Sequence, residues 1–178
     1  MLSLALTHLV SGWAMALRHA RSIRWSAPHV MWAVSALLQT TGNLASFWSM
    51  RDAPAWNSWL VLSNFAFAII NYVWCVFITP EVGDNGVLDL EAFHRDKRRQ
   101  YLAPFALLTV FSIGSNVVNG MFAGYENWLS DEVLSCVALA ITALAILSKR
   151  QSVQIAAGWA ILVVGIYFVI SASSIVGS

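Results

Sequence analysis

The chain has 178 residues, of which 58% are hydrophobic and 11% are charged, and its mean hydropathy is +0.67. About a quarter of the residues of a soluble domain are charged, so this composition excludes an ordinary water-soluble fold. The formal net charge of +1 argues against a nucleic-acid partner, because phosphate binding needs a clustered positive field. The length leaves room for about six helical spans of ~20 residues each. We therefore expect an all-α integral membrane protein with a single transmembrane domain over residues 1–178.

The first apolar stretch, residues 2–17, is followed at once by three arginines. A secretory signal carries its positive charge before the apolar run, so we expect a retained helical span. At 1.5 Å per residue its ~16 residues reach ~24 Å, which is less than a hydrocarbon core of ~30 Å. It is therefore the least secure span. Five further spans complete a predicted bundle of six transmembrane helices: residues 28–49, 56–78, 101–123, 130–147 and 153–176.

Residues 80–100 form the one long polar segment, which we name the connector. Pro80 ends the preceding span, because its ring and its missing N–H prevent the helix from continuing. Residues 83–86, Gly-Asp-Asn-Gly, predict a turn, since Asn and Gly accept positive φ. Residues 88–101 predict a short amphipathic helix at the membrane interface, whose basic end is attracted to anionic lipids. The candidate interfacial residues of the connector are Glu91, His94, Arg95, Lys97, Arg98 and Arg99.

The Lys and Arg residues are strongly biased to one side of the predicted membrane. Nine of the ten lie after the first, third and fifth spans, and the loops are short enough for the positive-inside rule to apply. We therefore expect the connector in the cytoplasm and both termini on the non-cytoplasmic side of a plasma or inner membrane. The connection after the fourth span is expected to carry acidic residues and no basic one: Glu126, Asp131 and Glu132.

The sequence also contains a candidate internal repeat. Sliding the chain so that Gly42 falls on Gly114 also places Trp56 on Trp128, without gaps. The matched stretches are two helical hairpins of the same orientation, so the repeat would be a parallel one. The alternative is chance similarity between apolar helices that share a small set of residue types.

The predicted spans hold many neutral polar side chains, whereas no buried carboxylate, lysine or arginine is expected in the membrane. Gln39 and Asn43 are four residues apart and Asn116 and Asn119 three apart, so each pair shares a helix face, and these faces are expected to converge. They either line a polar path or form interhelical hydrogen bonds, worth about 0.6 to 2 kcal/mol per contact. We favour the second interpretation. The candidate intramembrane cluster is Gln39, Asn43, Asn64, Asn71, Asn116 and Asn119.

These patterns leave three functions open. The first is a non-catalytic accessory or packing subunit of a membrane assembly, with lipids and either other membrane subunits or further copies of the chain as partners. The second is a channel or facilitative transporter for a small neutral solute. The third is a membrane enzyme that uses the connector around His94, beside Glu91 and Asp96. A single histidine without a matching pattern favours a solvated charged face, so we predict no catalytic residue, metal or cofactor.

Overall fold

The computed structural model describes residues 1–49, 58–84, 86–123 and 128–176, with the side chains at 49, 60, 119–123, 128–131 and 171–176 left out. The described residues form six helices and two very short strands. The helices are α1 (Leu2–His19), α2 (Ala27–Ser49), α3 (Ser58–Ile78), α4 (Leu90–Ala123), α5 (Trp128–Leu147) and α6 (Gln151–Val176). The strands are β1 (Ser22–Arg24) and β2 (Val87–Asp89).

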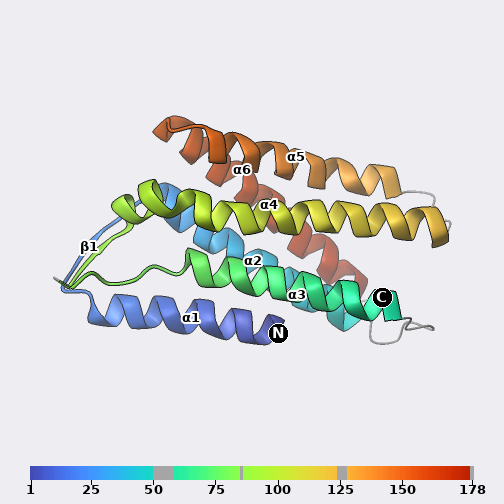
Figure 1. Ribbon diagram of the computed structural model, residues 1–178, viewed down its shortest axis with the longest axis horizontal. Coiled ribbons are helices and arrows are strands. Elements are labelled where there is room, and N and C mark those ends of the chain that lie inside the picture. Colours follow the sequence, from blue (N-terminus) through green and yellow to red (C-terminus); the bar gives the residue numbers. More distant parts are fainter. Residues whose placement is uncertain (50–57, 85, 124–127, 177–178) are drawn as a thin grey trace.

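The six helices lie lengthwise in one bundle (Figure 1). α2 packs most extensively against α6, and α4 packs against both α3 and α5. α1 lies against α3 and α2, and its N-terminal end stops well short of the far end of the bundle (Figure 1). α1 therefore covers only part of the bundle, in agreement with the short reach of residues 2–17.

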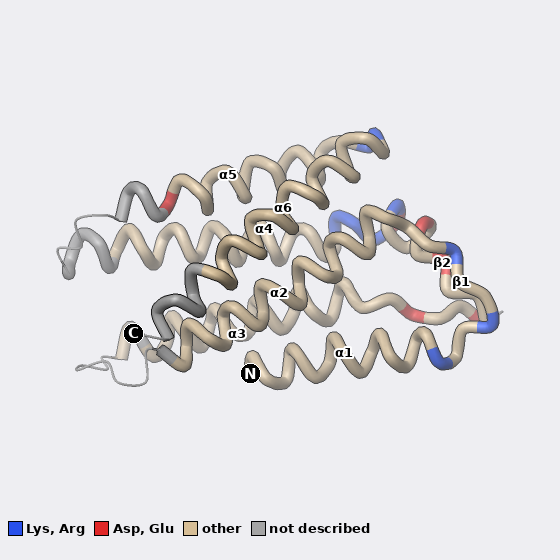
Figure 2. The backbone as a smooth tube through the Cα atoms, turned by 180° about the vertical axis from the view of Figure 1, so that it is seen from behind, with Lys and Arg blue, Asp and Glu red and all other residues tan. Residues whose placement is uncertain are grey.

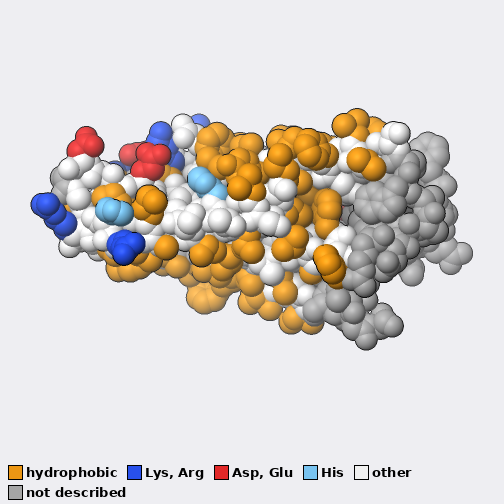
Figure 3. All heavy atoms as spheres, turned by 90° about the horizontal axis from the view of Figure 1, so that it is seen from below, with side chains coloured by type: hydrophobic (Ala, Val, Ile, Leu, Met, Phe, Trp, Pro, Cys, Tyr) orange, Lys and Arg blue, Asp and Glu red, His pale blue; other side chains and the backbone are white. Residues whose placement is uncertain are grey.

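Three described helices are long and apolar enough to cross a membrane: Val61–Ile78, Leu90–Val118 and Gln151–Ile170. A fourth described stretch, Glu132–Leu147, is apolar but shorter. Many large apolar side chains are exposed along the helices, and on the face shown in Figure 3 the charged side chains gather at one end. A soluble protein rarely exposes so large an apolar surface. The all-helical class is confirmed, and three of the described helices could cross a membrane.

The connector differs from its prediction in two respects. β1 pairs with β2 in a parallel two-stranded ribbon, with Ile23 opposite Leu88, so the segment after α1 is joined to the connector. The predicted turn is present, since the N–H of Gly86 donates to the carbonyl of Gly83 at 2.8 Å and Gly86 has a φ of 74°. The expected separate interfacial helix is instead the first part of α4, which begins at Leu90 and continues to Ala123.

Pro104 lies inside α4 without ending the helix. Its missing N–H leaves one backbone carbonyl of the preceding turn without its usual helical donor. The packing of Leu102, Phe105 and Leu108 in the main core offsets this local loss. α4 is therefore one continuous helix that contains both the basic part of the connector and the apolar segment that follows it.

The main core is rich in aromatic residues. The ring of Phe105 lies between those of Trp32 and Trp74, at centroid distances of 5.8 and 4.4 Å. Trp74 and Tyr101 are fully buried, whereas Trp25 is 62% exposed. Whether an aromatic ring turns inward depends on the neighbouring helices.

Candidate functional site

A cavity of about 210 Å³ lies between α2, α3, α4 and α6. It brings together three of the predicted amides, Asn43, Asn64 and Asn116, from three different helices. A smaller cavity of about 100 Å³ includes Gln39 and shares Asn43 with the first. The larger cavity, which we name the amide cavity, is lined by Asn43, Ser46, Phe47, Ser63, Asn64, Phe67, Phe111, Ser112, Ser115, Asn116 and Phe168.

A buried hydrogen-bond network joins α2 to α3 beside the amide cavity. Asn71 donates through Nδ2 to Thr40 Oγ1 at 3.1 Å, and Asn43 donates through Nδ2 to Asn71 Oδ1 at 3.3 Å. Gln39 in turn donates to Asn43 Oδ1 at 3.3 Å. Thr40 also lies 3.3 Å from the Cys75 sulfur, and Asn71 is fully buried. Asn43 and Asn71 therefore form a contact between α2 and α3, whereas Gln39 and Asn43 bond within α2.

Asn64 and Asn116 have different surroundings. Nδ2 of Asn64 is buried and has no hydrogen-bond partner. Asn116 is exposed, and its Nδ2 donates to Oε1 of Glu132 on α5. The side chain of Asn119, the last predicted member of the cluster, lies outside the described residues.

Glu132 corrects the expectation that the membrane part holds no buried carboxylate. It belongs to α5 rather than to a connecting loop, and it is only 5% exposed. Its Oε2 has no hydrogen-bond partner. Helical spacing places Glu132 on the same face of α5 as Ser135, which lines the smaller cavity. The sequence signal that could have found it is its place inside the predicted span 130–147.

The charged end of the bundle contains a second group of buried polar residues. His94 bonds through Nδ1 to the hydroxyl of Tyr101, and both side chains are buried. His29, which the sequence did not single out, is fully buried, with its ring 5.6 Å from that of Trp13 and 5.0 Å from that of Phe93. Neither ring nitrogen of His29 has a partner. The arrangement is an aromatic cluster that encloses two imidazoles.

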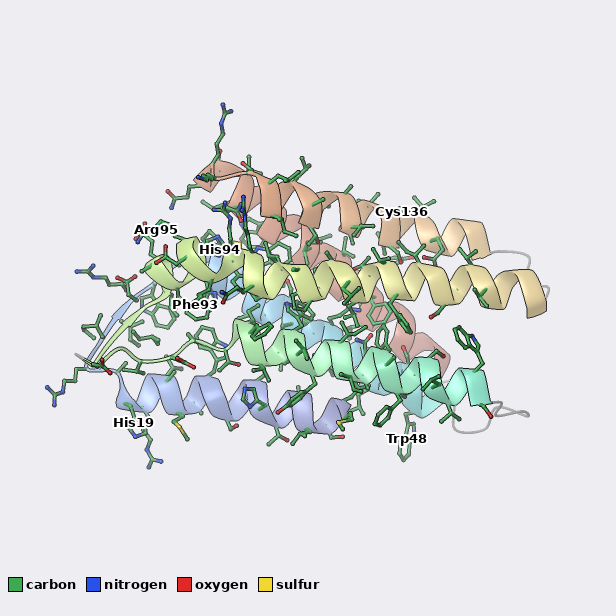
Figure 4. All side chains as sticks on the ribbon, in the orientation of Figure 1. His19, Trp48, Phe93, His94, Arg95 and Cys136 are labelled. Carbon is green, nitrogen blue, oxygen red and sulfur yellow. The ribbon has the colours of Figure 1, made fainter. Side chains whose placement is uncertain are left out.

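The remaining interfacial candidates point mostly outward. Glu91, Arg95, Lys97 and Arg99 are exposed, whereas Arg98 is 7% exposed. Figure 4 shows Arg95 directed away from the bundle and Phe93 on the side of α4 that faces α1. The described Lys and Arg residues lie at the end of the bundle that carries β1 and β2 (Figure 2).

The enzyme interpretation of the connector requires His94 to act together with neighbouring carboxylates. His94 is 7% exposed, but Glu91 and Asp96 are exposed on the surface of α4. No group of three or more His, Cys, Asp or Glu residues suited to a metal ion occurs in the part of the chain that the structure describes. Among the described residues, Glu91, His94 and Asp96 therefore form no metal site, and the histidine is buried whereas the two carboxylates are exposed.

Comparison with known proteins finds no family model, no curated protein and no solved structure that matches the chain. Function is therefore inferred from the geometry of the two polar sites.

Proposed function

We propose that this protein is a multi-pass membrane protein that provides a facilitated path for a small polar solute, with the amide cavity as its binding site. The observation that carries this proposal is the convergence of Asn43, Asn64 and Asn116 around a cavity of about 210 Å³. Small-molecule sites combine apolar walls with a few converging polar groups, and sites between helices of a bundle are common. The amide cavity has both features.

Interhelical hydrogen bonding alone does not account for all the amides. Asn71 and Asn43 bond to each other across α2 and α3, and their role in packing is sufficient to explain them. Asn64, in contrast, lines the cavity, and its buried Nδ2 has no hydrogen-bond partner. Buried polar groups normally have a partner. A polar ligand in the cavity would supply one.

We further propose that all six helices span the membrane, with the basic end of the bundle in the cytoplasm and both termini on the opposite side. α2 has 23 residues and α5 has 20, which correspond to ~34 and ~30 Å of helix and suffice for a hydrocarbon core of ~30 Å. The grouping of Lys and Arg at one end supports this orientation.

The parallel repeat of two hairpins stays a prediction. α4 packs extensively against α5, whereas α2 packs mainly against α6 and less against α3. A Cβ at Gly42 would meet Phe168, while one at Gly114 would meet nothing within 4 Å. The α2/α3 hairpin and the α4/α5 hairpin therefore pack differently, whether or not they share an origin.

The role of an accessory subunit also stays a prediction. It would require stable association with another chain or with further copies. The mass of the protein in mild detergent, measured by light scattering after purification from its own membrane, tests this directly.

Flux measurements test the proposed path. Purified protein is reconstituted into vesicles, and the entry of glycerol, urea and choline is followed. We expect at least one probe to enter faster than in protein-free vesicles. Asn64→Leu should abolish this entry, because it replaces a polar group of the cavity lining with an apolar side chain of the same branching, while no hydrogen bond of Nδ2 is lost. Thr41→Leu, on the exposed side of α2, is the matched control and should retain it.

The proposal is wrong if no probe enters faster than in protein-free vesicles. It is equally wrong if Asn64→Leu, shown by its thermal unfolding in detergent to be folded, carries the probe at the wild-type rate.

A further inference from the structure

We propose that the solute of the amide cavity is a small organic cation, with the Glu132 carboxylate as its counter-charge and phenylalanine rings as its walls. This inference rests on the proposed function, because it names the class of solute that the same cavity takes. It replaces the neutral solute that the sequence suggested. The reason for the change is the buried carboxylate, which the sequence analysis did not expect.

Glu132 is a buried acidic group without a described positive partner. It is 5% exposed, its Oε1 accepts a hydrogen bond from Asn116, and its Oε2 has no partner. Among the described residues, no Lys or Arg forms an ion pair with it. The described basic residues lie at the opposite end of the bundle (Figure 2). Burial of an unpaired carboxylate is costly, so such groups in membrane proteins usually mark a site for a cation or a proton.

Asn116 connects this charge to the cavity. Asn116 lines the amide cavity, and its Nδ2 donates a hydrogen bond to Glu132. The carboxylate does not line the cavity itself, but it is linked to the lining through this hydrogen bond. An amide that donates to a carboxylate is polarised, which makes its carbonyl oxygen a stronger acceptor. The wall at Asn116 is therefore electronegative, and it attracts a cation and repels an anion.

The apolar part of the lining distinguishes an organic cation from a metal ion. The rings of Phe47, Phe67, Phe111 and Phe168 come from four helices and surround the same cavity. The faces of aromatic rings attract ammonium groups, and rings of this kind recognise alkylated ammonium ligands. A small inorganic cation needs a shell of about six or more oxygens, which phenylalanine rings do not supply. The combination of a carboxylate, amides and rings fits an alkylated ammonium group.

Choline and its uncharged isostere 3,3-dimethylbutan-1-ol form a matched pair of probes for this inference. Isothermal titration of the purified protein in detergent should show saturable binding of choline and at least tenfold weaker binding of the isostere. In Glu132→Gln the side chain keeps an oxygen for Asn116 but loses its charge. We expect its affinity for choline to fall at least tenfold, about 1.4 kcal/mol, with no change for the isostere.

A second variant covers the case in which Glu132→Gln does not fold. Phe111→Leu keeps an apolar side chain but removes a ring, so it should weaken choline binding several-fold and leave the isostere unaffected. Thr41→Leu again serves as the control on an exposed face.

Three results would overturn the inference: no binding of choline, equal binding of the two probes, or unchanged choline affinity in folded Glu132→Gln. None of them contradicts the proposed path, which fails only if glycerol, urea and choline all cross vesicles no faster than without protein or if Asn64→Leu leaves flux intact. Binding of choline that Asn64→Leu does not change would place its site outside the amide cavity and would also overturn the inference.

Discussion

Asn116 on α4 donates a hydrogen bond through Nδ2 to Oε1 of Glu132 on α5, and this bond joins the two helices of the most extensively packed hairpin in the chain. The surroundings of the two residues differ. Asn116 is exposed, whereas Glu132 is 5% exposed and has one oxygen without a partner. The carboxylate therefore depends on the amide more than the amide depends on the carboxylate.

Removal of the amide should accordingly be harmful. Asn116→Leu leaves a buried carboxylate without its hydrogen bond, and we expect the free energy of unfolding to fall by about 2–4 kcal/mol. The double variant Asn116→Leu/Glu132→Leu removes the charge as well and should recover most of this loss. Thermal unfolding in detergent, followed by tryptophan fluorescence, measures both. A double variant as unstable as the single one would show that Glu132 is not destabilising when unpaired.

The α2–α3 network predicts a contrast between two asparagines of α3. Asn71 donates to Thr40 and accepts from Asn43, and Asn71→Ala breaks both contacts. We expect a loss of about 1–3 kcal/mol in the free energy of unfolding, because membrane hydrogen bonds contribute about 0.6–2 kcal/mol each. Asn64→Ala, whose Nδ2 has no partner, is the control and should cost much less. Equal losses in the two variants would contradict the network.

Two glycines that align in the candidate repeat should respond in opposite directions to alanine. A Cβ at Gly42 would lie 2.6 Å from Cε1 of Phe168, so Gly42→Ala must displace that ring and should lower stability by about 1–3 kcal/mol. Gly114 has nothing within 4 Å, and Gly114→Ala should raise stability by about 0.5–1 kcal/mol through helix propensity alone. Equal responses in the same assay would show that the two positions have equivalent surroundings.

The sequence was sufficient for features that depend on local pattern. The helical class follows from the apolar runs, and the turn ending at Gly86 follows from its Gly-Asp-Asn-Gly sequence. Asn43 and Asn116 lie on helix faces that were expected to converge, and the structure places both in the lining of the amide cavity together with Asn64. Helical spacing fixes which residues share a face, but it does not decide how far each of them is buried: Asn43 is buried, whereas Asn116 is exposed.

Features that depend on contacts between distant segments were missed. The pairing of Ile23 with Leu88 joins two strands of three residues each, and such short strands leave no periodicity to read. Glu132 was counted with the connection after the fourth span, and its burial depends on how α5 packs against α4. His29 is buried by rings from α1 and α4, which no local pattern of α2 predicts.

The two buried histidines at the charged end should differ in their structural importance. His29→Phe keeps the ring contacts with Trp13 and Phe93 and removes two nitrogens that have no partner, so we expect stability to stay within about 1 kcal/mol of wild type. His94→Phe leaves the buried hydroxyl of Tyr101 without its bond and should cost about 1–3 kcal/mol. The reverse order of stabilities would assign the structural role to His29.

Asp89, the last residue of β2, should make the stability of the protein depend on pH in the acid range, because it accepts a hydrogen bond from the first turn of α4. The N–H of Ala92 donates to Oδ1 of Asp89 at 2.9 Å, and this bond, with a contribution from Arg24, holds the pKa of the Asp89 carboxyl below its ordinary value of 3.8. A carboxylate whose pKa is lower in the folded state stabilises the fold above its ordinary pKa, and this stabilisation is lost as the pH falls through the folded pKa.

Asp89→Asn should therefore be less stable than wild type at pH 7, and the difference should shrink as the pH is lowered below 3.8. Arg24→Gln removes only the ion pair, whose atoms lie 3.4 Å apart with Arg24 well exposed, and should have a smaller effect at pH 7. Unfolding of the three proteins in an acid-stable detergent at a series of pH values measures these differences. A stability difference between Asp89→Asn and wild type that is constant from pH 7 into the acid range would mean that the charge on Asp89 does not cap α4.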